Sequence, residues 1–157
     1  MTELQKREPD SAQFIRPQRQ WADLVVNFYP PHESDLANSL LNVRLVLRPT
    51  ISHPDLSDVL LPDDGVPPAI RLNLDRDMGK PVDVLEVDSH ATYENIRRLE
   101  QIICDDMPDL HRVCDRDANS TLGAITGTTG ETLQSYPLAL TQLLITHYML
   151  KATQAHQ

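Results

Sequence analysis

An alternating stretch near the middle of the chain constrains the fold most strongly. Ile70, Leu72 and Leu74 alternate with polar residues, and valine recurs after the turn that follows them. Alternation with a period of two is typical of a strand that buries one face. The stretch therefore predicts a β-hairpin, 69–75 with 81–87, whose apolar face other elements must cover.

Two more strands and a short helix are expected before this hairpin. Residues 21–29 and 42–48 alternate apolar with polar side chains, which predicts strands, and residues 33–41 between them have leucines at helical spacing. Residues 49–68 are rich in proline and predict a long, partly rigid loop with one helical turn from Ser52. Loops of this length are commonly functional or interface elements, so this one is a candidate contact surface.

The C-terminal part of the chain is predicted to be mainly helical. After the hairpin, apolar residues at helical spacing predict a helix that ends before Pro108, and a short second helix runs to about Asp115. Residues 118–130 are mostly small and polar and predict a loop, and a last helix follows over 131–155. Pro137 either kinks this helix or marks its true first turn. The fold class is therefore α+β, with a small, mainly antiparallel sheet of about four strands packed with three C-terminal helices.

Residues 1–20 differ from the rest of the chain in composition. Charged residues and prolines dominate this segment, and Phe14 and Ile15 are its only large apolar pair. Such a composition predicts an extended N-terminal arm, followed by one α+β domain over 21–157. A neighbouring subunit is the natural partner for the arm, with Phe14 and Ile15 as the anchor.

The negative charge of the chain is concentrated in one block. Residues 55–117 carry the whole formal net charge of −9, because the segments on either side sum to zero. Such a field repels phosphate backbones, so direct binding of nucleic acid is not expected. A basic protein surface is a more natural partner for this block.

The two cysteines and the absence of long apolar runs bear on location. Cys104 and Cys114 lie in a region predicted to be helical, about 15 Å apart, which is too far for a disulfide. Reduced thiols indicate a cytoplasmic protein or a particle assembled inside a cell. No apolar run approaches the length that a bilayer requires, so no membrane contact is predicted.

The last helix is apolar on nearly every side. Its leucines, isoleucine and aromatic residue, with Leu144 and Tyr148 near the middle, leave no wide polar face. An exposed surface helix would keep such a face, so this helix is expected to be covered all round. Two interpretations stay open: a central core helix against the sheet, or a helix partly covered by another chain.

One group of residues resembles part of a zinc site. Cys104, His111 and Cys114 lie close in sequence, but a fourth donor is missing. Four aspartates surround both thiols, which opposes the low thiol pKa that a nucleophilic cysteine needs. Two thiols without a catalytic or metal-binding role are therefore expected.

A second group resembles part of a calcium loop. Asp115, Asp117 and Asn119 match its first ligand positions, but Ser120 replaces the required glycine and Thr126 the bidentate glutamate. The glycines nearby also lack the lysine that a phosphate loop carries. We therefore predict no metal, cofactor or catalytic residue.

The combined pattern favours a non-enzymatic protein–protein interaction subunit of a larger, oligomeric assembly, of which a viral or phage particle is one example. Two alternatives stay open: an acidic regulatory or inhibitor protein that binds a basic, nucleic-acid-binding surface, and a small enzyme of unknown chemistry. The predicted contact residues come from the arm, the long loop and the last helix: Phe14, Ile15, Val59, Leu60, Leu61, Leu144 and Tyr148.

Overall fold

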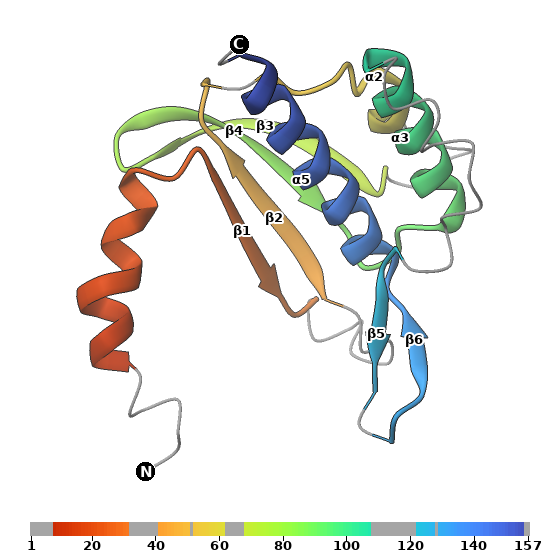
Figure 1. Cartoon of the computed structure of the whole chain (residues 1–157), viewed down its shortest axis with the longest axis horizontal. Coiled ribbons are helices and arrows are strands. Elements are labelled where there is room, and N and C mark those ends of the chain that lie inside the picture. The colour runs from red at the N-terminus through yellow and green to blue at the C-terminus, as the bar shows by residue number, and fades with distance from the viewer. Residues whose placement is uncertain are drawn as a thin grey trace.

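A four-stranded antiparallel sheet forms the centre of the fold (Figure 1). Its strands are β1 (Leu24–Tyr29), β2 (Asn42–Leu47), β3 (Ile70–Asp77) and β4 (Lys80–Val87). They lie in the order β1-β2-β4-β3, so β1 and β3 are the edge strands. The computed structural model describes residues 8–31, 41–50, 52–61, 68–107, 122–127 and 129–155.

The predicted hairpin is confirmed as β3 and β4, and it is longer than expected. The strands pair up to Asp77 and Lys80, which leaves Met78 and Gly79 as a two-residue turn. Both turn residues have positive φ, 51° and 79°, the signature of the type I′ turn that matches strand twist. Methionine is not a residue that usually marks such a turn, so the prediction ended the first strand too early and began the second one too late.

The helices α3 (Tyr93–Asp106) and α5 (Tyr136–Ala155) pack on one face of the sheet, as Figure 1 shows. Thr92 caps α3 reciprocally with Asn95, which satisfies free amides of the first turn. The short helix α2 (Ser57–Leu60) adds to the same core. The largest fully buried side chains of this core are Leu45, Leu56, Ile70, Leu85, Leu99, Leu140 and Leu144.

The last helix starts at the second of the two positions expected for it, with Pro137 in its first turn. A small two-stranded sheet, β5 (Ala124–Thr126) with β6 (Thr132–Gln134), occupies part of the expected loop and the first expected helical turn. Helix α5 therefore begins at Tyr136, with Pro137 in its first turn, where a missing amide costs nothing. The loop interpretation failed because short, exposed strands carry little hydrophobic pattern.

Other boundaries also moved. Strand β1 begins at Leu24 and not at residue 21, and the helical turn of the long loop begins at Ser57 and not near Ser52. The predicted helices over 33–41 and towards Asp115 lie outside the described residues, apart from residue 41.

The second face of the sheet carries no helix among the described residues, yet it buries a small cluster of valines. Val46, Val82 and Val84 are at most 4% exposed, and Val25 packs against them. Charged side chains on β2, β3 and β4, or next to their ends, lie around this cluster, as described below. This face is therefore closed by ion pairs and not by a second layer.

Cys104 corrects the prediction of reduced thiols, because it is disulfide-bonded. The distance estimate assumed one helix from Cys104 to Cys114, whereas α3 ends at Asp106. Cys114, the other cysteine of the chain, lies outside the described residues. In the described part of the chain, no helix is both long enough and apolar enough to span a bilayer.

Candidate interaction surface

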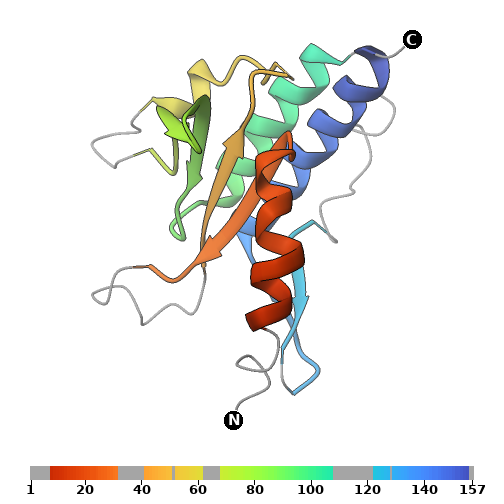
Figure 2. The same cartoon turned by 90° about the vertical axis from the view of Figure 1, so that its left-hand side faces the viewer.

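The N-terminal arm is helical but barely touches the domain. Residues 8–10 lead into a π-helical turn, η1 (Ser11–Ile15), and a 3₁₀ helix, η2 (Arg16–Gln20), and no side chain of either is buried. Phe14 is 59% exposed and Ile15 is 64% exposed. Figures 1 and 2 show this helix projecting beside β1, away from α3 and α5. The two predicted anchor residues are therefore exposed to solvent and do not pack against the domain.

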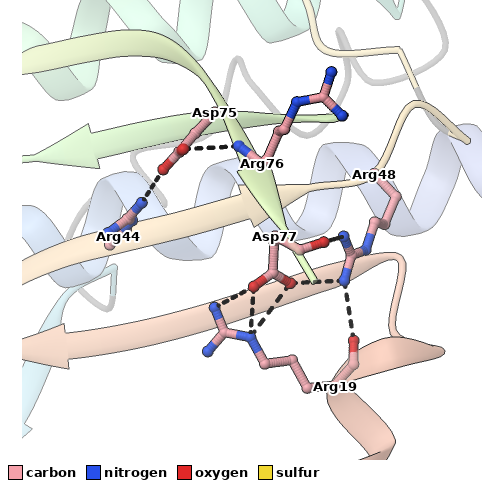
Figure 3. Close-up of polar contacts among 6 residues, drawn as sticks. All are labelled: Arg19, Arg44, Arg48, Asp75, Arg76 and Asp77. Carbon is pink, nitrogen blue, oxygen red and sulfur yellow. Dashed lines mark hydrogen bonds and ion pairs between the residues drawn. The ribbon is translucent and has the colours of Figure 1, made fainter. Parts of the chain in front are cut away.

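The arm is fastened at its base by one carboxylate (Figure 3). Asp77, at the end of β3, accepts a hydrogen bond from Arg19 Nε at 3.1 Å and another from Arg48 at 2.7 Å. Arg48 also donates to the backbone carbonyls of Asp77 at 3.1 Å and Arg19 at 3.3 Å. The hairpin end, the end of β2 and the arm thus meet in one charged cluster, Arg19–Arg48–Asp77.

Two of the three side chains of the cluster are largely shielded from water, whereas that of Arg19 is 46% exposed. The side chain of Arg48 is 8% exposed and that of Asp77 is 14% exposed. The hydrogen bond from Arg19, with the charges of Arg19 and Arg48, lowers the pKa of Asp77 against the opposing effect of burial. Since a buried charge is costly without its partner, this cluster fixes where the arm leaves the domain.

Further ion pairs cross the second face of the sheet. Asp75 on β3 pairs with Arg44 on β2 at 2.8 Å, and Arg71 lies 3.7 Å from Glu86 and 3.5 Å from Asp88. Figure 3 shows Arg44 and Asp75 beside the cluster at the arm base. Arg44, from outside the acidic block, therefore neutralises one of its carboxylates, and Arg71 pairs with two others within the block. These pairs weaken the case for an acidic regulatory or inhibitor protein that binds a basic surface through this face.

A pocket of about 370 Å³ lies at the base of the arm. Trp21 forms one wall, and its side chain is 79% exposed. Trp21 was predicted to lie in a strand, but it lies in the turn between the arm and β1. The pocket is lined by Gln20, Trp21, Ala22, Asp23, Arg48, Pro49, Thr50, Lys80 and Pro81.

The other predicted contact residues divide into buried and exposed ones. Val59, Leu144 and Tyr148 are 3%, 0% and 2% exposed and belong to the main core, so a partner on the folded domain cannot reach them. Leu60 is half-buried against the same core, and Leu61 is 64% exposed. Of the two interpretations of the last helix, the structure supports the core helix, because the chain's own sheet and α3 cover α5.

One polar group lies inside the helical layer. His147 on α5 is fully buried, and its Nε2 lies 2.7 Å from a carboxylate oxygen of Asp106 at the end of α3. Lys151 contacts the same oxygen at 2.9 Å. The hydrogen bonds from His147 and Lys151 lower the pKa of Asp106. The contact joins α3 to α5. It was not predicted, because His147 and Asp106 are 41 positions apart in the sequence.

The regions resembling ligand sites lie mostly outside the described residues. Among the described residues, no three His, Cys, Asp or Glu side chains lie close enough to hold a metal ion. His111, Cys114, Asp115, Asp117 and Asn119 lie outside these residues. The glycines serve the small hairpin instead: Gly127 donates to the Glu131 carbonyl, and Gly123 packs against the start of α5.

Comparison with known proteins assigns no relative. No protein-family model matches the chain, and no curated protein shows significant similarity to it.

Proposed function

We propose that this chain is a non-enzymatic protein–protein interaction subunit of a larger assembly, and that its arm docks on a neighbouring copy. The observation that carries the proposal is the exposure of Phe14 and Ile15 on a helix that the domain does not cover. A viral or phage particle is one setting for such a subunit. The proposal includes no contact with nucleic acid or membrane.

The arm has little to stabilise it as a lone helix. Isolated helices of fewer than about 12–15 residues are marginal in water. Neither arm segment has a side-chain cap, and Pro17 lies within the second. Its single firm attachment among the described residues is the cluster at its base. Contact with another protein would supply the missing burial of Phe14 and Ile15.

A second copy is the occupant that the surface features favour. The domain offers an open pocket walled by Trp21, and the arm offers an apolar pair that needs a pocket. Asp10 on the arm is exposed and Lys80 lines the pocket, so an exchanged arm would bring opposite charges together.

The cytoplasmic location now has less support than the assembly role. The expectation rested on reduced thiols, and Cys104 is disulfide-bonded. No feature of the described residues favours the small-enzyme alternative.

The double variant Phe14→Asp with Ile15→Asp tests the proposed arm contact. Burying two such side chains contributes about 1.5–3 kcal/mol each, so the association constant should fall at least about 100-fold. Sedimentation velocity of the two proteins measures this change directly.

The matched control places the same charges on the same arm. Ala12→Asp with Gln13→Asp changes two exposed neighbours without touching the anchor. The control should assemble as the unchanged protein does. Equal assembly by the anchor variant and the control would reject the role of Phe14 and Ile15.

A further inference from the structure

Strand β3 presents an open edge. It is an eight-residue strand, and its inner side pairs with β4 along its whole length. No other described element pairs with its outer side. Exposed edges of this length usually carry a protective device, because their free amides and carbonyls can pair with another chain.

The pairing of the hairpin determines which backbone groups point outward. Asp77 and Lys80 close the two-residue turn, so they form a hydrogen-bonded pair, and such pairs alternate along the strands. Leu72, Leu74 and Arg76 therefore point their amides and carbonyls to the open edge. Pro81, opposite Arg76, agrees with this assignment, because the Arg76 position needs no amide from its partner.

A second contact supports the same assignment. The backbone amide of Arg76 donates to the side chain of Asp75 at 2.7 Å, so it is turned away from β4. This contact protects the edge near the turn. Among the described residues, the outward amides of Leu72 and Leu74 have no such contact.

The middle of this edge is also unusually apolar. Leu74 is 86% exposed, the highest value among the exposed large hydrophobic residues of the described chain. It follows the half-buried Leu72 on the face that carries the helices, beyond the cover that they provide. A strand added to this edge would extend the core past Leu72 and cover Leu74.

We propose that β3 pairs antiparallel with β3 of a second copy, with the two Asn73 residues opposite each other on the two-fold axis. In this register Leu72 faces Leu74 of the second copy in a hydrogen-bonded pair. Arg71 faces Asp75 of the second copy in the closer, non-hydrogen-bonded position. The symmetry repeats each contact, and the two four-stranded sheets join into one.

Charge complementarity selects the second copy as the occupant. Opposite charges directly across two strands stabilise a pair, and like charges destabilise it. The side chains of Arg71 and Asp75 remain 39% and 51% exposed, so their pairs within the chain leave room for a further contact.

Neighbouring registers fit less well. A shift by one residue would place residues whose amides and carbonyls point to the open edge opposite residues whose amides and carbonyls already bond to β4. Centring the pair on Leu74 would keep one leucine pair, Leu74 with its own copy, but would set Leu72 opposite Arg76. Arg71 would then face Asp77, whose carboxylate is already held by Arg19 and Arg48. The register centred on Asn73 is therefore preferred, because it pairs both leucines of each strand and sets Arg71 opposite a carboxylate, Asp75, that is still 51% exposed.

This surface is separate from the arm. Contact through β3 is isologous and closes after two copies, whereas exchange of arms adds further copies. One chain with both contacts would form more than a dimer. Loss of the arm should therefore leave the β3 dimer intact, so the two proposals can fail independently.

Disulfide trapping tests the register. In the full chain, Asn73→Cys should form a covalent dimer under mild oxidation, because facing residues of such a pair lie about 4.5 Å apart at Cα. Leu74→Cys and Asp75→Cys should form at least about tenfold less covalent dimer than Asn73→Cys. In this register neither residue lies directly opposite the same residue of the second copy. The unchanged protein controls for its two native cysteines. Equal trapping at the three positions would overturn the register.

A proline at the edge tests the pairing itself. Leu74→Pro removes an amide that β4 does not use, so the fold should persist, which circular dichroism can verify. It deletes two intermolecular hydrogen bonds per dimer, and the dimer should weaken at least about 30-fold. Leu74→Ala keeps the amide and should weaken it less. A folded proline variant that dimerises like the unchanged protein would overturn the proposal.

Discussion

Replacing Asp77 with alanine is expected to lower the free energy of unfolding by about 3–5 kcal/mol, the usual cost of breaking a buried ion pair. Arg48 would keep its charge at 8% side-chain exposure without a carboxylate. Arg19 would lose its partner on the domain, so the arm should also become a faster substrate for trypsin at Arg19. Urea denaturation and a timed digest measure the two effects.

The neighbouring ion pair provides the control. Asp75→Ala, compared at a protein concentration at which the proposed β3 dimer is dissociated, removes a pair between Asp75, 51% exposed, and Arg44, 40% exposed. Exposed pairs of this kind contribute about 0–1 kcal/mol, so the change in unfolding free energy should be small. A similar fall in the free energy of unfolding for Asp77→Ala and Asp75→Ala would contradict the importance of the cluster at the arm base.

The difference between the unchanged protein and Asp77→Ala should depend on pH. The native pKa of Asp77 lies below its ordinary value, mainly because Arg19 donates a hydrogen bond to it. Its stabilisation is therefore present above the unfolded pKa of about 3.9 and is lost as the pH falls through the native pKa. The difference should be largest near neutral pH and shrink in acid. Other carboxylates with lowered pKa, such as Asp106, cancel in this comparison.

Replacing Gly123 with alanine is expected to cost about 2–4 kcal/mol, the sum of backbone strain and a steric clash. Gly123 has a φ of +72°, and an added Cβ would lie 2.2 Å from the carbonyl oxygen of Ser135. Its amide donates to the side chain of Gln142 at 2.7 Å, which joins the β5–β6 hairpin to α5. Thermal or urea denaturation reports the loss.

Gly130 separates the two causes of this effect. It also has a positive φ, +88°, but an added Cβ would meet nothing within 4 Å. Gly130→Ala should therefore cost only the strain, about 1 kcal/mol. Equal costs at Gly123 and Gly130 would show that the close approach to Ser135 contributes nothing.

The sequence predicted those elements whose pattern reflects a buried face. The alternation through Ile70 and Leu72 identified the hairpin, and the helical spacing around Leu99 identified α3, because burial selects apolar residues at regular intervals. Leu74 shows the limit of this pattern. It continues the alternation, yet it lies beyond the helices and is exposed.

The surface features depended on contacts that no local pattern contains. The Arg19–Arg48–Asp77 cluster joins three distant parts of the chain, and the His147–Asp106 contact joins two helices. Segment charges implied one acidic block, but folding brings Arg44 beside Asp75 and Arg48 beside Asp77. Composition alone could not show that partial neutralisation.

Burial likewise decided which predicted contact residues can meet a partner. Apolar character alone could not separate Val59 and Leu144, which complete the core, from Phe14 and Ile15, which remain outside it. The last helix illustrates the same point. Its apolar surface faces the sheet and α3, while Met149 stays 66% exposed.

The central proposal, a subunit whose arm docks on a neighbouring copy, is tested most directly by the solution mass with and without residues 1–20. One chain has a mass of 17.7 kDa. We expect the full chain to sediment as more than two copies, and the chain without the arm to sediment as the dimer formed through β3. The same number of copies in both proteins would contradict the role of the arm.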